Sequence, residues 1–127
     1  MLFRSERYIY AYIVGANAAY LKDDLEQTKE FAQEALSLDI NCGEGYYYLA
    51  LVREKEEDFD EAIECMKRAI TSDVNNAKYY AEMSNIYRAK NDLKTAFEYI
   101  KEAESIEHST EYQIIYKELA TLSRKSK

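Results

Sequence analysis

The chain has 127 residues, of which 47% are hydrophobic and 32% charged, enough apolar material for one folded domain without disulfides or metals. It contains no proline and only 3 glycines, so the turns that β-sandwiches, barrels and loop-built active sites require are scarce, and helices are favoured. The formal net charge of −7 would repel a phosphate backbone, which disfavours a nucleic-acid partner.

The N-terminal segment combines basic residues with an apolar run. Arg4 and Arg7 precede the apolar residues 8–14, an order that is similar to a secretory signal. Glu6 lies among the basic residues, however, and Asn17 interrupts the apolar run well short of the length that crosses a membrane. We therefore expect a buried amphipathic helix in this segment and no association with a membrane.

The sequence repeats itself with a period of 34 residues, and this repetition decides the architecture. In each copy an aromatic residue, a small residue, an aspartate and an alanine recur in the same order. These positions are Tyr12, Tyr46 and Tyr80; Ala16, Ala50 and Ser84; Asp24, Asp58 and Asp92; and Ala35, Ala69 and Ala103. Agreement in size and polarity over three copies predicts a solenoid of three equal units.

Each unit is predicted to be a pair of helices. In the second copy, residues 46–53 carry one helical stripe, and residues 59–70 carry another with apolar residues three and four positions apart. The charged residues 54–58 form the turn, where Asp58 or Asp60 can accept a hydrogen bond from the amides that open the next helix. The equivalent pairs are Asp23 with Asp24 in the first copy and Asn91 with Asp92 in the third.

Small residues are expected where the two helices of a unit cross, because helices approach closely only where side chains are short. Ala50 and Ala62 are the predicted contact in the second copy. Ser84 and Ala96 repeat this contact in the third copy, whereas the first copy has Thr28 in place of the second alanine. The substitution weakens the pattern of the first unit without moving its register.

The last segment leaves the repeat but keeps a helical pattern. We expect residues 111–124 to form a helix that covers the apolar face left open by the last unit. Its apolar stripe is Tyr112, Ile115, Tyr116, Leu119 and Leu122. The basic Arg124, Lys125 and Lys127 suit the negative end of such a helix.

This pattern resembles the tetratricopeptide repeat family, whose unit is a helix pair with an aromatic, a small residue and alanines at these relative places. The resemblance covers residues 9–110. It implies an all-α fold, a right-handed α-solenoid of three helix-turn-helix hairpins at residues 9–42, 43–76 and 77–110. The capping helix at residues 111–124 completes a single domain over residues 1–127. The chain departs from the family where Ile40, Val74 and His108 replace the proline that often closes a unit.

Patterns that carry catalytic or metal chemistry are scarce. His108 is the only histidine and has no recurring acid or nucleophile beside it, so neither a catalytic triad nor a zinc site can be assembled. Gly15, Gly43 and Gly45 are isolated and form no phosphate loop. Residues 58–63 begin like a calcium loop but lack its glycine. We predict no catalytic residue, no metal and no cofactor, and therefore not an enzyme.

The two cysteines, Cys42 and Cys65, form no CxxC pair. A disulfide between them is possible by counting alone, but a chain with a sufficient core has little need of one, and free buried cysteines are common. We therefore expect reduced thiols, which suit a cytoplasmic location.

A second stripe of residues is not explained by the core, and it accounts for several of the 13 tyrosines. Resemblance to the family places this stripe on the concave face, where such proteins usually hold an extended or helical peptide. The predicted peptide-binding residues are Tyr10, Ile13, Asn17, Tyr20, Tyr47, Tyr48, Leu51, Lys78, Asn85 and Arg88. The alternative is that these rings cover helix edges or pack beneath the capping helix.

The best-known ligand of the family is the acidic C-terminal tail of heat-shock chaperones, held by a clamp of basic and asparagine side chains. The corresponding places here are Ile13, Asn17, Tyr48, Lys78 and Glu82. Only Asn17 and Lys78 match the clamp, and an acid replaces one of its cations. The groove therefore lacks the charge to neutralise a terminal carboxylate, and this ligand is disfavoured.

Two functional hypotheses remain. The first is an adaptor or chaperone-like scaffold that binds a protein or peptide segment with an apolar anchor in its groove. The alternative is a self-assembly module, in which the apolar residues 8–14 of the first helix pack on another copy and build homo-oligomers.

Overall fold

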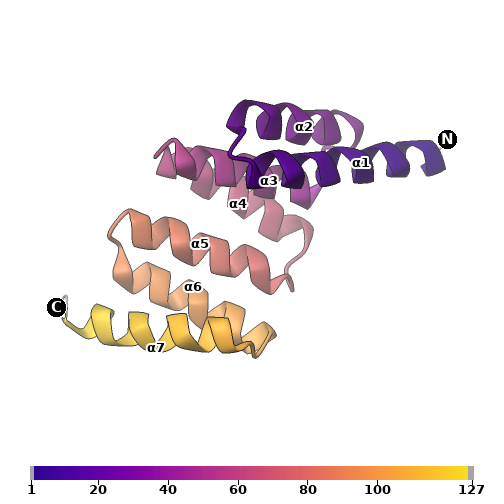
Figure 1. Cartoon of the computed structure of the whole chain (residues 1–127). Coiled ribbons are helices and arrows are strands. Elements are labelled where there is room, and N and C mark those ends of the chain that lie inside the picture. Colours follow the sequence, from indigo (N-terminus) through magenta and orange to yellow (C-terminus); the bar gives the residue numbers. More distant parts are fainter. Residues whose placement is uncertain (1, 126–127) are drawn as a thin grey trace. The chain divides into compact units, whose positions relative to one another are not determined.

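The structure, a computed structural model, describes residues 2–125, so Lys127 of the predicted basic tail lies outside the described residues. Within residues 2–125 the chain forms seven helices and no strand (Figure 1), which confirms the predicted all-α fold. The helices are α1 Leu2–Leu21, α2 Leu25–Leu38, α3 Gly43–Lys55, α4 Phe59–Ser72, α5 Ala77–Ala89, α6 Leu93–Ile106 and α7 Thr110–Lys125.

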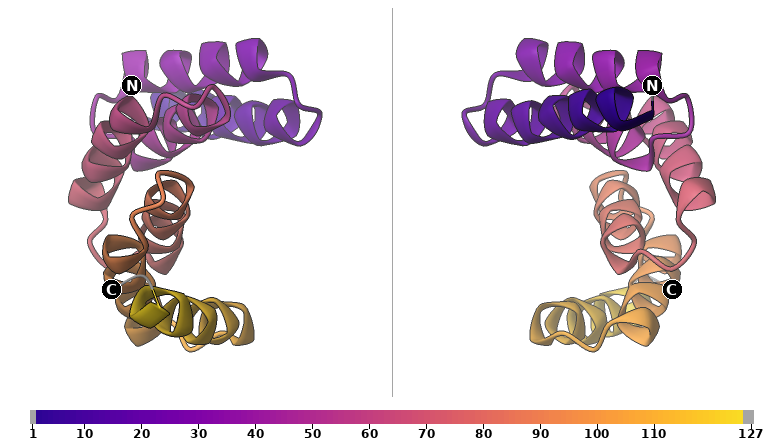
Figure 2. Two further views of the ribbon diagram at one scale, coloured as in Figure 1. Left: turned by 90° about the vertical axis from the view of Figure 1, so that its left-hand side faces the viewer. Right: turned by 90° about the vertical axis from the view of Figure 1, so that its right-hand side faces the viewer.

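The helices pair as the repeat predicts. α1 packs against α2, α3 against α4, and α5 against α6, while α7 packs against α6. The chain divides into two compact units, Met1–Ser72 and Asp73–Lys127, and the division falls in the turn between α4 and α5. Both views of Figure 2 show α1 beside α2 in the first unit and α6 beside α7 in the second. The right-handed course of the solenoid and the single domain stay predictions.

The predicted small residues lie at the helix crossings. Ala50 and Ala62 have no exposed surface. Ser84 is equally buried, and its hydroxyl donates a 2.7 Å hydrogen bond to the carbonyl of Ala96 on the facing helix. Thr28 is also fully buried. Its hydroxyl donates a hydrogen bond to the backbone carbonyl of Asp24 at 2.8 Å. The threonine of the first copy therefore fits the crossing without an unsatisfied polar group.

An aspartate begins the second helix of every hairpin. Its carboxylate accepts a hydrogen bond from the amide three residues on, at 3.1 Å for Asp24, 3.4 Å for Asp58 and 3.2 Å for Asp92. Of the two candidates in the second copy, the structure assigns this role to Asp58 and not to Asp60. These caps satisfy amides that have no partner within the helix, and they fix where each helix starts.

The residue before each of these aspartates adopts a left-handed backbone conformation. The φ angle is 62° at Asp23, 62° at Glu57 and 69° at Asn91. Each following aspartate donates its amide back to a carbonyl five residues earlier, 2.9 Å away in all three turns, which is the bond that closes a Schellman motif. The left-handed region penalises a side chain with a Cβ, and asparagine and aspartate tolerate it better than glutamate does.

The last helix covers the core of the second unit as predicted. Leu119 is fully buried within the core cluster of that unit, and the other four residues of the predicted apolar stripe pack against the same cluster. Ser109 caps this helix, since its hydroxyl accepts a hydrogen bond from the amide of Tyr112 at 3.1 Å. The helix extends one residue beyond the predicted range at each end.

Replacing Ala62 with leucine tests the hairpin crossing. The larger side chain has no space at a position without exposed surface, so we expect the free energy of unfolding to fall by roughly 1–3 kcal/mol. Lys67→Leu, on an exposed position of the same helix, is the matched control and should change stability by less than about 0.5 kcal/mol. Equal urea midpoints for the two variants would contradict the assigned crossing.

Replacing Glu57 with asparagine tests the turn. Because asparagine tolerates the left-handed conformation better, we expect the free energy of unfolding to rise by roughly 0.5–1 kcal/mol. The reciprocal change, Asn91→Glu in the equivalent turn, should lower it by a similar amount. Thermal unfolding of both variants checks this pair of predictions. A loss of stability in Glu57→Asn would show that a contact of the glutamate stabilises the fold by more than its left-handed conformation costs.

Candidate functional site

The predicted residues of α1 and α3 lie together in the first unit. The Tyr48 hydroxyl donates a 3.0 Å hydrogen bond to Oδ1 of Asn17. The rings of Tyr47 and Tyr48 meet edge to face, with centroids 5.2 Å apart. Nζ of Lys55 lies 5.8 Å from the centroid of the Tyr20 ring, a cation–π contact. We call this surface, made of Tyr10, Ile13, Asn17, Tyr20, Tyr47, Tyr48 and Leu51, the α1–α3 face.

The α1–α3 face has a buried floor and an accessible rim. Ile13, Tyr48 and Leu51 are only 8%, 7% and 5% exposed, because they belong to the core cluster of the first unit. Tyr10 is 72% exposed and Asn17 is also exposed, while Tyr20 and Tyr47 are half-buried. A ligand would therefore meet the rings and the amide of the rim, and it would touch the floor only where the rim leaves it open.

The hydrogen bond from Tyr48 orients the Asn17 amide. Burial raises the pKa of the Tyr48 phenol, and the nearby Glu44 carboxylate raises it further, so the hydroxyl stays protonated and donates at neutral pH. The bond occupies Oδ1 of Asn17, and the amide nitrogen can still donate to a carbonyl outside the chain. The face thus offers an oriented donor beside aromatic rings.

The predicted polar residues of the site lie on α5, in the second unit. Lys78 and Asn85 are exposed, and Asn85 donates a 3.4 Å hydrogen bond to Glu82. Arg88 forms a salt bridge with Glu118 of α7. The sequence predicts Arg88 as a donor for an acidic ligand, but in the structure a carboxylate of this chain already occupies it. An acidic ligand at Arg88 has to compete with Glu118.

Two residues that contact the predicted site residues were not predicted from the sequence. Lys55 lies at the end of α3 against Tyr20, and Glu118 pairs with Arg88. Lys55 could have been found from its position on α3, one helical turn beyond Leu51. Glu118 belongs to α7, which lies outside the 34-residue period, so nothing in the repeat indicated its neighbour.

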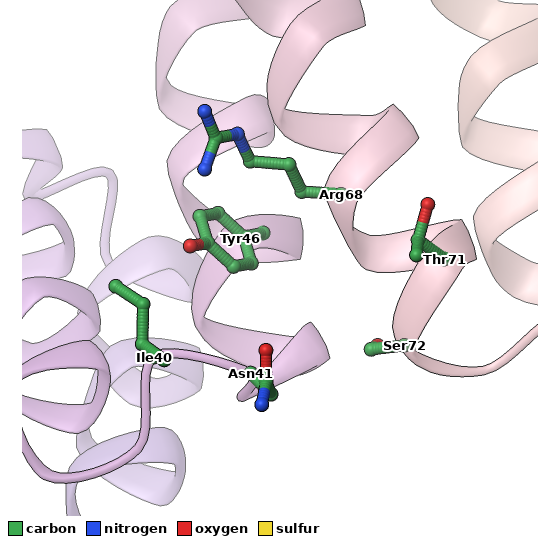
Figure 3. Close-up of a pocket in the computed structure, with 6 residues that line it drawn as sticks. All are labelled: Ile40, Asn41, Tyr46, Arg68, Thr71 and Ser72. Carbon is green, nitrogen blue, oxygen red and sulfur yellow. The ribbon is translucent and has the colours of Figure 1, made fainter.

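A pocket of about 440 Å³ lies beside Tyr46, between the α2–α3 turn and the C-terminal end of α4 (Figure 3). Its lining residues are Ile40, Asn41, Tyr46, Arg68, Thr71 and Ser72. The guanidinium carbon of Arg68 lies 5.6 Å from the centroid of the Tyr46 ring. In the next copy the Tyr80 hydroxyl donates to the carbonyl of Val74 at 2.8 Å, so this tyrosine supports the turn before α5. None of the lining residues belongs to the predicted peptide site.

Among residues 2–125, no group of three or more His, Cys, Asp or Glu side chains is placed to hold a metal ion. No helix in the described part is both long and apolar enough to cross a membrane. Cys42 and Cys65 are free thiols, and burial is the main cause that raises the pKa of Cys65 to about 11. His108 is exposed, and its hydrogen bond to Glu104 at 2.7 Å raises its pKa.

Two family models described as tetratricopeptide repeat match the chain, at residues 43–76 and 77–108. Together they cover just over half of it. The first match coincides with the second predicted unit, and the second match ends two residues before the end of the third predicted unit. The first predicted unit, residues 9–42, lies outside these two matches. No curated protein matches the chain in sequence.

Several solved structures share the fold. The first TPR of Spaghetti (RPAP3) bound to the HSP90 peptide SRMEEVD has a TM-score of 0.85 and 11% identity, covering 93% of this chain and 97% of that one. The TPR2B domain of yeast Sti1 in a pHsp70 complex has a TM-score of 0.81 and 18% identity, covering 91% and 98%. An O-GlcNAc transferase mutant of Thermobaculum terrenum also reaches 0.81 at 18% identity, covering 84% of this chain but 21% of that one.

Truncating one floor residue and one rim residue tests the division of the α1–α3 face. Leu51→Ala removes a buried side chain from the core and should lower the free energy of unfolding by roughly 2–5 kcal/mol. Tyr10→Ala removes a mostly exposed side chain and should change it by less than about 0.5 kcal/mol. Denaturant unfolding measures both, and a large loss of stability in Tyr10→Ala would show that the rim is part of the core.

Proposed function

This chain belongs to the tetratricopeptide repeat family, and from that premise we propose that it is a non-enzymatic scaffold that holds a peptide segment of a partner protein. Its repeats form a protein-interaction scaffold, and the proposal concerns where and what it binds. The observation that carries the proposal is the α1–α3 face, where exposed and half-buried rings surround an oriented amide.

The proposed ligand carries a hydrophobic or aromatic anchor. Tyr10 and Tyr47 present ring faces and edges, which gain contact area at little cost in side-chain entropy. Asn17 can donate a hydrogen bond to a backbone carbonyl of the ligand, which would fix its register along α1. An apolar side chain flanked by a free backbone carbonyl is therefore the segment that fits this face.

An acidic group of a ligand would suit the polar residues of α5, which belong to the second unit. Lys78 and Asn85 are exposed on that helix and can meet a carboxylate. Arg88 contributes less, because the ligand must first displace the carboxylate of Glu118. The proposed contacts on α5 therefore tune affinity and salt dependence, while the anchor supplies most of the binding energy.

Chaperone tails are not the proposed ligand, although two of the structurally similar TPR domains are complexes with HSP90 and Hsp70 segments. Ile13 stands at the first clamp position and is buried in the core. Glu82, at the last position, is an acid that is 8% exposed. A terminal carboxylate would meet an apolar side chain at Ile13, and it would meet a like charge at Glu82, where the clamp has cations.

The compartment proposed for this scaffold is the cytoplasm. Cys42 and Cys65 are both free, and Cys42 is only half-buried. A reducing compartment keeps such thiols from forming mixed disulfides, which supports the proposed location.

Peptide capture tests the proposed site. We expect the chain to select, from a random peptide library, segments with an aromatic or large aliphatic anchor, and to favour those that also carry an acid. Tyr47→Ala should lower the affinity for the selected peptides at least about 30-fold, since truncating a central aromatic side chain commonly costs 2 kcal/mol or more of binding free energy. Arg88→Ala should lower this affinity only several-fold. A chaperone-tail peptide ending in acidic residues should bind poorly.

The matched control for peptide capture is Leu38→Ala. Leu38 is an apolar residue of α2 that is 42% exposed and lies outside the α1–α3 face. Its truncation should leave binding unchanged in fluorescence anisotropy titrations. Tight binding of the chaperone tail, or equal losses for the Tyr47 and Leu38 variants, would contradict the proposed site.

A second candidate function, self-association through α1, is favoured by a separate observation. Tyr8 and Val14 lie on the first helix within the predicted apolar segment, and they are 52% and 49% exposed. A contiguous exposed apolar surface commonly marks a site that binds another surface. Tyr8 and Val14 lie outside the α1–α3 face, although the predicted apolar segment also includes Tyr10 and Ile13 of that face.

A further inference from the structure

One stripe of α1 is exposed from residue 7 to the end of the helix. It consists of Arg7, Ala11, Val14, Ala18 and Leu21, which are spaced four and three residues apart and therefore share one side of the helix. Val14 is 49% and Leu21 is 76% exposed. We call this set the α1 stripe. Four of its five residues are apolar, although all of them face outward.

The repeat shows what this side of a helix normally does. The equivalent residues of α3 lie 34 positions on, and Gly45, Tyr48 and Val52 among them are buried. A Cβ placed at Gly45 would lie 2.8 Å from Cγ of Leu36, because this side of α3 packs against α2. The α1 stripe is therefore the packing side of a repeat helix, and no described helix of this chain covers it.

We propose that a second copy of the chain covers the α1 stripe, with the two α1 helices antiparallel across a two-fold axis at Val14. The proposal rests on the second candidate function and gives its geometry. Val14 lies at the middle of the stripe, so a two-fold axis there brings it against the partner's Val14. Ala11 then lies near the partner's Ala18, where two short side chains allow the helices to approach closely.

Charge decides between the antiparallel and the parallel arrangement. The stripe begins at Arg7, and α1 is followed by Asp23 and Asp24 in an exposed turn. In an antiparallel pair, Arg7 reaches the partner's Asp23 and the partner's Asp24, and the helix dipoles oppose each other favourably. In a parallel pair, Arg7 would lie against the partner's Arg7, so like charges disfavour it.

The other end of the chain does not offer a matching surface. Ile114 is a large apolar residue that α7 exposes, at 58%. The exposed residues around it are polar or charged, namely Gln113, Lys117, Glu118 and Thr121. Stacking α1 of one copy on α7 of the next would bury these polar and charged groups against the apolar α1 stripe, which disfavours a head-to-tail filament. A symmetric pair buries the α1 stripe of both copies in one contact, and it forms a closed dimer instead of a filament.

A contact formed by one helical stripe is small, so the pair is expected to dissociate on dilution. Sedimentation equilibrium of the full chain across a concentration series from micromolar to millimolar should show a reversible monomer–dimer equilibrium. Val14→Lys places two like charges on the axis and should leave the chain monomeric over the whole series. Circular dichroism checks that helicity is unchanged, since Val14 is half exposed.

Val74→Lys is the matched control. Val74 is 58% exposed and lies in the turn between α4 and α5, outside α1, so the same substitution adds the same charge away from the stripe. This variant should dimerise like the unchanged chain. Loss of dimer in both variants, or in neither, would overturn the assignment of the stripe.

Cysteine cross-linking tests the antiparallel geometry separately from self-association. In a chain carrying Cys42→Ser and Cys65→Ala, Val14→Cys should form a disulfide-linked dimer with copper phenanthroline, because its two Cβ atoms meet at the axis. Ala11→Cys should cross-link efficiently only when mixed with Ala18→Cys. A dimer that cross-links best through Ala11→Cys alone would overturn the antiparallel arrangement and leave self-association standing. A monomer at every concentration would overturn both.

Discussion

The close approach of paired helices at short side chains is the constraint on which the rest of this structure depends. Ala50 on α3 and Ala62 on α4 have no exposed surface, and Ser84 fits because its hydroxyl donates across the crossing to Ala96. These contacts set the spacing within each hairpin. Between the first two hairpins α3 packs against α2 and α1, and there the Tyr48 hydroxyl reaches Asn17 on the candidate binding face.

The sequence predicts the helices well because their determinants are local and repeated. Each aspartate cap lies beside the helix that it begins, so Asp24, Asp58 and Asp92 mark three helix starts without any knowledge of tertiary contacts. The last helix was predictable for a related reason. A solenoid leaves an apolar face at its end, and the apolar stripe of α7, with Leu119 at its centre, is the pattern that covers such a face.

Two properties of the predicted site residues could not be predicted from the sequence. These are how deeply each side chain is buried and which residues outside the 34-residue repeat it contacts. The 34-residue period groups Tyr10 with Ile13 on one side of α1, but it does not say that Ile13 is in the core and Tyr10 in solvent. α7 also lies outside the 34-residue repeat, so the salt bridge between Arg88 and Glu118 could not be predicted from the repeat. The apolar part of the candidate face in the first unit is therefore a buried floor, and Arg88 on α5 of the second unit is already partly neutralised.

Nuclear magnetic resonance of the labelled chain tests most directly whether the α1–α3 face of the first unit holds the ligand, which is the central claim. During titration with a captured peptide, we expect amide shifts to concentrate at Tyr10, Asn17 and Tyr47, with little change at Leu38 on α2. Within the first unit, shifts that concentrate on α2 and α4 and leave α1 and α3 unchanged would contradict this claim.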